Sequence, residues 1–376
     1  MSRVEPDGRR ARRFRRVLVV VGALVVTPIL AVTTFLLAVP TPVDGFDPES
    51  WQPGPGLTIA DELTAPAVVE QLGDPIHGPE DIAMDDDGML YTGDRSGTIW
   101  RVDPADGSAE IFARVGGRPL GLAFAPDGRL VVANHGLGLQ AVDPAGRVEV
   151  LADTAGGAPI LFANDLDVGP DGVVYLSDSS HRYNTTTLGD VPSYLLPDLL
   201  DGRAAGRLLS HDLRTGVTTV LLDGLYFPNG VAVTADGDRV WVAESNRYRI
   251  LEHTLGGGTR TLLDDLPGTP DNIDRTDDGD MLIALYDRTA ALDTLVLPSD
   301  LARRIMIRLP GGLFVNEEDP LTGGIVVADD DGSITAHHTG LAPAATSVLP
   351  AGGRWYLGAL LGQPVRWMRE PASPAG

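Results

Sequence analysis

A short phrase repeats along this chain and restricts its fold more than any other feature. In each copy an apolar run leads through a glycine turn, usually Asp-Gly, into a second apolar run. Asp-Gly in this setting predicts a β-hairpin, because glycine adopts the positive φ angles that tight hairpin turns require. The copies are IAMDDDGMLYTGD (82–94), LAFAPDGRLVVAN (122–134), LDVGPDGVVYLSD (166–178), VAVTADGDRVWVAE (231–244), IDRTDDGDMLIAL (273–285) and, more weakly, SVLPAGGRWYLGAL (347–360).

Units of about forty residues with four short strands each are typical of β-propellers. We therefore predict an all-β fold, a six-bladed β-propeller over residues 57–376, with a pair of β-sandwiches as the alternative. The segment PAVVEQ (66–71) precedes the first unit and is expected to supply the outer strand of the last blade. Insertions at 179–205 and 286–322 are expected to form loops on one face. The most helix-like stretch in them, 192–202, is interrupted by a proline.

An uncharged apolar run occupies residues 17–39. At about 1.5 Å per residue a helix of this length reaches roughly 35 Å, enough for a hydrocarbon core of about 30 Å. We predict one N-terminal transmembrane helix that acts as a signal-anchor, with a cleaved signal peptide and a secreted protein as the alternative. The basic tail 1–16 is expected in the cytoplasm, which places the propeller outside it. Residues 40–56 are rich in proline and glycine and are expected to form a linker.

Charge and composition exclude several functions. The chain carries a net charge of −23, and the tail alone contributes +5, which leaves −28 on the remaining residues. An acidic body of this kind repels nucleic acid, so nucleic acid is excluded as a partner. The chain has no cysteine, which excludes disulfides, zinc–thiolate sites and cysteine nucleophiles. Without a G-x-S-x-G motif a serine-hydrolase mechanism has no support, and the acidic oxygens suit hard cations.

Polar residues precede several of the predicted first strands. In a propeller these strands all line the central channel in the same direction, so the residues ahead of them meet at one mouth of the channel. Each residue alone could simply cap a turn, but their equivalent repeat positions favour one shared site. Carboxylate and amide oxygens are the ligands that calcium prefers. We predict one Ca²⁺ at the channel mouth, held by Glu80, Asn164, Asn229, Asp271 and Asn272.

Several phrases resemble strictosidine synthase-like propellers, and most closely the adipocyte plasma membrane-associated protein group. The similar segments extend over about residues 76–368 and occur in the same order along the chain. Members of that group also tend to carry an N-terminal membrane anchor. Paraoxonases and the gluconolactonase/regucalcin family are similar more distantly. The phrases are GPED (78–81), GRPLGL (117–122), NDLDV (164–168), DGVVYLSDSS (171–180), GRLLSHD (206–212), VLLDGLYFPNGVAV (220–233), VAESNRYRI (242–250) and PDNI (270–273).

The resemblance to paraoxonases implies metal sites and also shows departures. The predicted channel-mouth ligands match those of the paraoxonase calcium. A second, structural calcium would match Asp81, Asp165 and the backbone carbonyl of Leu122, with turn hydrogen bonding as the alternative role of both aspartates. Leu120 replaces one histidine of the paraoxonase dyad, and His135 matches the other. Thr346 stands where strictosidine synthase has its catalytic glutamate.

These features predict a calcium-dependent hydrolase of lactones or aryl esters that acts on a small-molecule substrate. The metal would polarise the carbonyl, and the candidates for the base are His135, Asp271 and Glu80. A non-catalytic, calcium-stabilised propeller that binds a ligand or a protein outside the cytoplasm is the second interpretation. Condensation of an amine with an aldehyde is disfavoured because of the threonine. Substrate contacts are expected from His181, Tyr183, Leu120 and Thr346.

Overall fold

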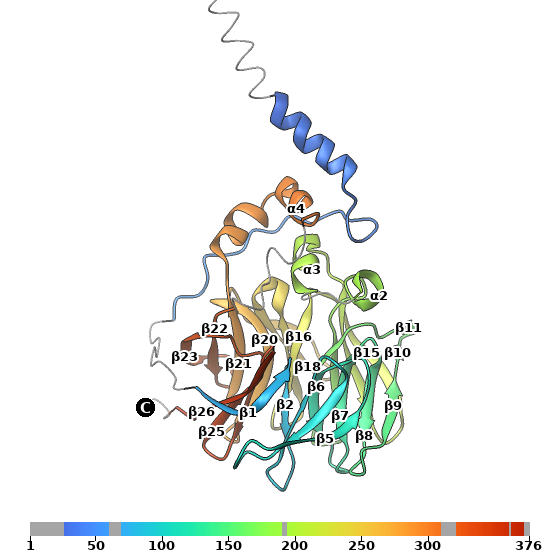
Figure 1. Cartoon of the computed structure of the whole chain (residues 1–376), viewed down its shortest axis with the longest axis vertical. Helices are drawn as coiled ribbons and strands as arrows, with labels where there is room; N and C mark the ends of the chain where they lie inside the picture. The colour runs from blue at the N-terminus through green and yellow to red at the C-terminus, as the bar shows by residue number, and fades with distance from the viewer. Residues whose placement is uncertain (1–25, 60–68, 190–193, 310–320, 361, 372–376) are drawn as a thin grey trace, which may run out of the picture.

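Six four-stranded antiparallel sheets form the body of the protein (Figure 1). The computed structural model describes residues 26–59, 69–189, 194–309, 321–360 and 362–371. The first strand of each sheet contacts the first strand of the next, and the first strand of the last sheet returns to that of the first. The sheets therefore form a closed ring, and the predicted six-bladed propeller is confirmed.

The blades follow the order of the chain, with the innermost strand first in each. Blade 1 holds β2 (Ile82–Met84), β3 (Leu90–Gly93), β4 (Thr98–Val102) and β5 (Ala109–Arg114). Blade 2 holds β6 (Arg118–Phe124), β7 (Leu130–His135), β8 (Gly138–Val142) and β9 (Val148–Ala152). Blade 3 holds β12 (Ala163–Val168), β13 (Val173–Asp178), β14 (Gly206–Asp212) and β15 (Val217–Leu225).

The second half of the ring has the same arrangement. Blade 4 holds β16 (Pro228–Val233), β17 (Arg239–Glu244), β18 (Arg249–Thr254) and β19 (Thr259–Leu263). Blade 5 holds β20 (Gly268–Arg275), β21 (Met281–Asp287), β22 (Gly323–Ala328) and β23 (Ile334–Leu341). Blade 6 holds β24 (Val348–Ala351), β25 (Arg354–Leu357), β26 (Gly362–Arg369) and β1 (Glu70–His77). A small hairpin of β10 (Thr154–Ala155) and β11 (Ala158–Pro159) lies outside the blades.

Strand β1 closes the ring, because it pairs with β26 as the outermost strand of blade 6. The sequence predicted that a segment before the repeats supplies this outer strand, but it placed the strand at the apolar residues of 66–71. The structure places the strand at Glu70–His77, where Leu72 and Ile76 bury their side chains. Residues 66–68 lie outside the described residues.

The apolar core is divided into six layers, one between each pair of neighbouring blades. Each of the six main clusters of buried side chains draws its members from two adjacent blades. The layer between blades 1 and 6, for example, joins Leu90 to Tyr356. Burial on both faces explains why the middle strands are continuous apolar runs, such as Leu130, Val131 and Val132, all fully buried.

The two insertions carry short helices at the end of the propeller that faces the N-terminal segment (Figure 1). The first contains α2 (Thr185–Leu188) and α3 (Leu195–Asp201), and the second contains η2 (Leu292–Val296) and α4 (Asp300–Met306). A further turn, η1 (Ser245–Arg247), follows β17. Pro197 does not prevent α3, because it falls in the first turn, where backbone N–H groups have no helical acceptor. We call the helices of the two insertions the cap.

Residues 26–38 are helical and lie beyond the cap, and 40–59 contain no helix or strand (Figure 1). In the described part of the chain, no helix has both the length and the apolar character needed to cross a membrane. The first nine residues of the predicted span, 17–25, lie outside the described residues, as does the basic tail. The transmembrane helix and the topology remain predictions.

Candidate metal and active site

The site is built at an irregularity that recurs in four blades. Where the innermost strand pairs with the second strand, two residues of the inner strand face a single residue of its partner. Such a β-bulge turns side chains away from their regular alternation. The single opposing residue is always small, alanine or serine. The doubled pairs are Leu120–Gly121, Asn164–Asp165, Asn229–Gly230 and Asp271–Asn272.

The two residues of a bulge serve two different cavities. The first residue of each pair lines a cavity beneath the cap, and so does Glu80 at the entry to blade 1. Of the second residues, Asp165 and Asn272 line the central channel, and so does Asp81, which follows Glu80. Four of the five predicted channel-mouth ligands therefore lie together. The structure places Asn272 in the channel instead, because the bulge sends neighbouring side chains to opposite sides.

The cavity beneath the cap has a volume of about 410 Å³, and a row of polar side chains crosses it. Asn164 Nδ2 donates to Asn229 Oδ1 at 2.8 Å, and Asn229 Nδ2 donates to Asp271 Oδ1 at 2.5 Å. Ser179 Oγ fixes Asn164 from behind by accepting from the same amide at 2.9 Å. Blades 3, 4 and 5 thus join their bulge residues directly.

The carboxylates of this cavity are buried and lie close enough to repel each other. Burial raises the pKa of Asp271 well above its usual value, and the negative charge of Glu80 raises it further. Burial likewise raises the pKa of Tyr286, with the charge of Asp271 as the next cause. Arg118 offsets part of this charge by an ion pair with Glu80, at 3.1 Å between Nη2 and Oε2.

The donor set fits a calcium-type ion. Two carboxylates and two amides offer hard oxygens from four blades, and a divalent cation would relieve the repulsion that raises the pKa of Asp271. Among the described residues, no group of three or more histidines and carboxylates lies close enough to hold an ion alone. The amide oxygens of Asn164 and Asn229 are therefore essential members of any such site.

The central channel holds a second acidic group, in a cavity of about 300 Å³. Asp81 and Asp165, two of the residues predicted for a second metal, line it together with Asp167 and Asp274. Burial is the first cause of a raised pKa in all four carboxyl groups, and that of Asp81 rises to about 7. The buried Oδ1 of Asn272 has no hydrogen-bond partner among the described residues. No three of these carboxyl groups lie close enough to hold an ion alone, so a cation in the channel would also need the Asn272 oxygen.

The channel aspartates also join neighbouring blades. Asp81 accepts from the backbone N–H of Leu122 at 2.7 Å, and Asp165 accepts from that of Val231 at 2.8 Å. Asp274 accepts from Val348 in the same way at 2.8 Å. Leu122 thus contacts Asp81 through its N–H, and the predicted role of its carbonyl as a metal ligand stays a prediction. The turn-type hydrogen bond that was the alternative also occurs, from the Ile82 N–H to Asp81 at 2.8 Å.

His135, a predicted base, lies outside the lining of the cavity. Its ring stacks on Phe162 with 3.9 Å between the ring centres, and Phe162 faces the cavity. Nε2 accepts from the Thr185 N–H at 3.3 Å, and burial lowers the pKa of His135 to about 3. The imidazole is therefore neutral, and the ring that faces the cavity at this point is that of Phe162. Of the predicted bases, Asp271 and Glu80 reach the cavity.

The predicted substrate contacts are dispersed. Leu120 lines the cavity. Thr346 is buried beside it, and its hydroxyl donates to the Glu80 carbonyl at 2.5 Å. His181 is exposed on the first insertion, Tyr183 is buried there, and neither belongs to the described lining of the cavity.

Sequence reasoning missed the other lining residues. Arg118 stands two positions before a bulge, within GRPLGL, so its repeat position was a usable signal. The residues of the apolar wall had no such signal, because most of them lie in the two insertions, outside the repeated pattern. The residues that form this wall are Phe162, Leu195, Leu196, Leu199, Phe227, Leu292, Met306, Leu321 and Leu360.

Comparisons with known protein families give a consistent result. The family model described as strictosidine synthase matches residues 164–257, and the model described as strictosidine synthase-like, N-terminal, matches residues 65–102. Protein STRICTOSIDINE SYNTHASE-LIKE 6 of Arabidopsis thaliana is 32% identical over 296 residues, covering 76% of this chain and 77% of the relative. The adipocyte plasma membrane-associated protein of Salmo salar is 35% identical over 304 residues, covering 72% and 68%.

Solved structures share the fold at low identity. A gluconolactonase from Xanthomonas campestris superposes with a TM-score of 0.60 at 18% identity, over 85% of this chain and 97% of that one. A regucalcin from Agrobacterium tumefaciens, described as a calcium-binding protein, gives 0.52 at 14% identity, over 81% and 95%. At these identities the likeness establishes the propeller architecture.

Proposed function

The chain belongs to the strictosidine synthase-like family, and from this premise we propose that it is a calcium-dependent hydrolase of lactones or aryl esters. One observation carries the proposal. Glu80, Asn164, Asn229 and Asp271, from four different blades, bring hard oxygen ligands to one apolar-walled cavity. The gluconolactonase fold neighbour is consistent with this class of substrate.

The reaction needs three contributions at this cavity. Calcium, when bound by these four residues, supplies a positive charge that polarises the substrate carbonyl. Asp271 is the base we assign, because it lines the cavity and Asn229 donates to only one of its two carboxylate oxygens. It takes a proton from water as the oxygen of that water bonds to the carbonyl carbon. The C–O bond to the alcohol then breaks, and the proton passes to the departing alkoxide.

The remaining lining orients the substrate. Asn229 holds Asp271 through the hydrogen bond to Oδ1, which leaves its other oxygen for the proton. Arg118 holds Glu80 and places a fixed positive charge beside the reacting carbonyl. The apolar wall excludes bulk water and suits an aryl or alkyl group. Strictosidine synthase-type condensation is not favoured, because Thr346 provides no carboxylate and its hydroxyl bonds to the Glu80 backbone.

We also propose that the protein is anchored by residues 17–39 with its propeller outside the cytoplasm. The uncharged run, the basic tail before it and the exposed apolar helix at 26–38 support this arrangement. No nucleic acid partner is proposed, in keeping with the acidic body.

Calcium titration of the chelator-treated protein, combined with turnover of phenyl acetate and a lactone panel, tests the hydrolase. We expect Asp271→Asn to abolish turnover and weaken calcium binding while the protein stays folded by circular dichroism. Asp198→Asn is the matched control, since Asp198 is equally buried but does not line the cavity. Turnover that survives both chelation and Asp271→Asn would refute the proposal.

A calcium-stabilised binding propeller is the second candidate. It is favoured by the channel, where the aspartates join blades and need no substrate. Tight calcium binding with no turnover on the whole panel would support it.

A further inference from the structure

The cap carries apolar side chains on its outer side. Leu295 on η2, Leu301 on α4 and Leu309 just after it are 68%, 50% and 37% exposed. We call these three residues the cap surface. Helix 26–38, which lies at the same end of the molecule, exposes Val26, Ile29, Leu30 and Leu37 (Figure 1). Of the fourteen large apolar side chains exposed in the described residues, these seven lie at one end of the molecule, and such a concentration indicates a contact surface.

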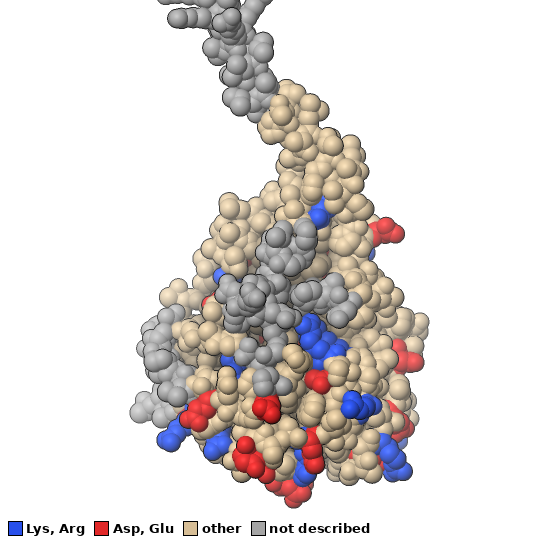
Figure 2. Space-filling model, in the orientation of Figure 1, with Lys and Arg blue, Asp and Glu red and all other residues tan. Residues whose placement is uncertain are grey.

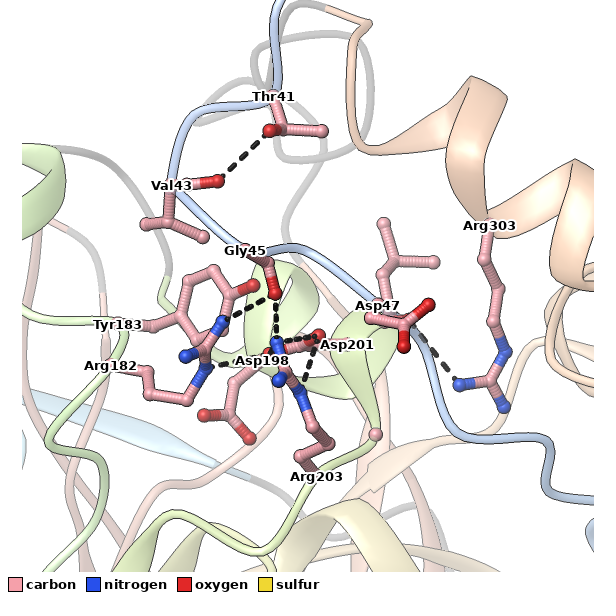
Figure 3. A network of polar contacts seen from close by, with 12 residues as sticks. Thr41, Val43, Gly45, Asp47, Arg182, Tyr183, Asp198, Asp201, Arg203 and Arg303 are labelled. Atoms are coloured by element: carbon pink, nitrogen blue, oxygen red, sulfur yellow. Dashed lines mark hydrogen bonds and ion pairs between the residues drawn. The ribbon is translucent and has the colours of Figure 1, made fainter.

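The linker fixes the end of that helix to the cap. Arg308 Nε donates to the carbonyl of Val39 at 2.7 Å, where the helix ends. Arg304 pairs with Asp47 at 2.8 Å, and Arg203 Nη2 donates to the Gly45 carbonyl at 2.6 Å. Figure 3 shows Arg182 and Arg203 reaching the Gly45 carbonyl from the first insertion. Whatever surrounds the helix therefore lies next to the cap.

The inner side of the same cap forms the apolar wall of the cavity. Leu195 and Leu199 on α3 line the cavity, as do Leu292 on η2 and Met306 on α4. Within the described residues, η2 and α4 thus each carry one side chain of the apolar wall and one of the cap surface. A molecule with an apolar chain would meet similar surroundings on both sides of these helices.

Charge is distributed in the opposite way along the molecule. Each inner strand begins at the cavity and runs away from it, so the Asp-rich hairpin turns lie at the far end of the propeller. On the face drawn in Figure 2, most of the visible charged side chains lie at that end, and the exposed charges of the cap are paired, as Arg304 is with Asp47 and Asp300. An orientation with the cap toward a membrane keeps the acidic turns away from anionic lipid headgroups.

We propose that the cap surface lies in the interfacial layer of the membrane that holds the N-terminal helix, and that the cavity takes amphiphilic esters or lactones from that layer. The contact surface follows from the exposed leucines and the fixed linker. The substrate class rests on the proposed hydrolase and anchor, and adds that the acyl or aryl chain partitions into lipid before it reaches Asp271.

Single-cysteine labelling tests the membrane contact, because the chain has no cysteine of its own. Full-length Leu295→Cys and Leu301→Cys are labelled with an environment-sensitive fluorophore and reconstituted into phosphatidylcholine vesicles. Val217→Cys and Val150→Cys, with exposures of 57% and 54% on outer strands, are the matched controls. We expect lipid-attached nitroxides to quench only the two cap probes.

The other outcomes contradict the proposal. Equal quenching at all four positions, or none at the cap, would show that the cap is not in the interface. Cap probes that are shielded from iodide but not quenched by lipid would indicate a second copy of the chain or a protein partner. If the protein does not float with the vesicles in a density gradient, it does not bind the membrane and the proposal fails.

A second experiment tests the substrate class. We expect Leu301→Glu to lower turnover of a vesicle-borne 4-nitrophenyl laurate by about tenfold, because a charge opposes insertion into lipid. Turnover of soluble 4-nitrophenyl acetate should stay unchanged, and Val150→Glu should affect neither ester. An equal loss on both esters would refute delivery from lipid. If neither ester is hydrolysed, the hydrolase proposal fails, while the quenching result still decides the membrane contact.

Discussion

Gly230 allows two inner strands to approach closely, so Gly230→Ala tests how the site is assembled. A Cβ at this position would lie 2.4 Å from the Asp271 carbonyl oxygen and 2.6 Å from the Ile273 nitrogen. Both are backbone atoms of the next blade and cannot rotate away. Carbon contacts normally lie at about 3.5 to 4.0 Å, so β16 and β20 must separate by about 1 Å.

The energetic cost follows from two opposing effects. Overpacking of this kind costs about 1–3 kcal/mol, whereas removing a glycine from the unfolded chain returns about 0.4–1 kcal/mol. We expect a net loss of about 1–2 kcal/mol in the free energy of unfolding, which lowers the Tm by about 4 °C. Separation of the strands also weakens the hydrogen bond between Asn229 and Asp271, so calcium affinity should fall with stability.

Gly258→Ala is the matched control for thermal and urea unfolding. A Cβ there meets nothing within 4 Å, and the φ angle of Gly258 is not positive. This variant should be as stable as the parent or slightly more so, with unchanged calcium affinity. If Gly230→Ala unfolds at the same temperature as Gly258→Ala and binds calcium equally well, close approach of the inner strands is not what assembles the site.

Three further outcomes follow from buried charges. Asp178→Asn should cost about 3–5 kcal/mol in urea unfolding, because it leaves Arg207 buried without its carboxylate; a loss below about 1 kcal/mol would contradict this. The pKa of Asp81 is about 7 in the folded protein, against 3.8 for an ordinary aspartate, so between these values the folded state binds more protons than the unfolded state. In the presence of chelator, the free energy of unfolding should therefore fall as the pH rises from about 4 to 7. Calcium should reverse this trend, and a flat profile without metal would argue against burial of these carboxyl groups. Arg118→Gln should raise calcium affinity by about tenfold in calorimetric titration, because a nearby positive charge is removed; a lower affinity would show that Arg118 mainly orients Glu80.

The sequence was sufficient for the blades, because their turns and apolar strands are local signals that repeat. It also predicted which residues meet, since equivalent positions in a closed ring converge. It did not reveal that Asn272 lines the channel, because a two-residue period cannot show a bulge, and the bulge decides which side of the strand each residue faces. Nor did it reveal the surroundings of His135, because its hydrogen bond with Thr185 comes from the first insertion, which has no repeat equivalent.

The aspartate hydrogen bonds between inner strands connect blades 1 to 2, 3 to 4 and 5 to 6. The odd blades supply the acid, and the even blades supply a backbone N–H. Alternation of this kind makes a pair of blades the smallest part that can be exchanged between relatives without leaving an acid unmatched. A chimaera whose junction follows blade 2 or blade 4 takes both partners of every such bond from one parent. A junction within a pair would combine the aspartate of one parent with the inner strand of the other. The ring therefore has six blades, but the aspartate hydrogen bonds group them into three two-blade modules.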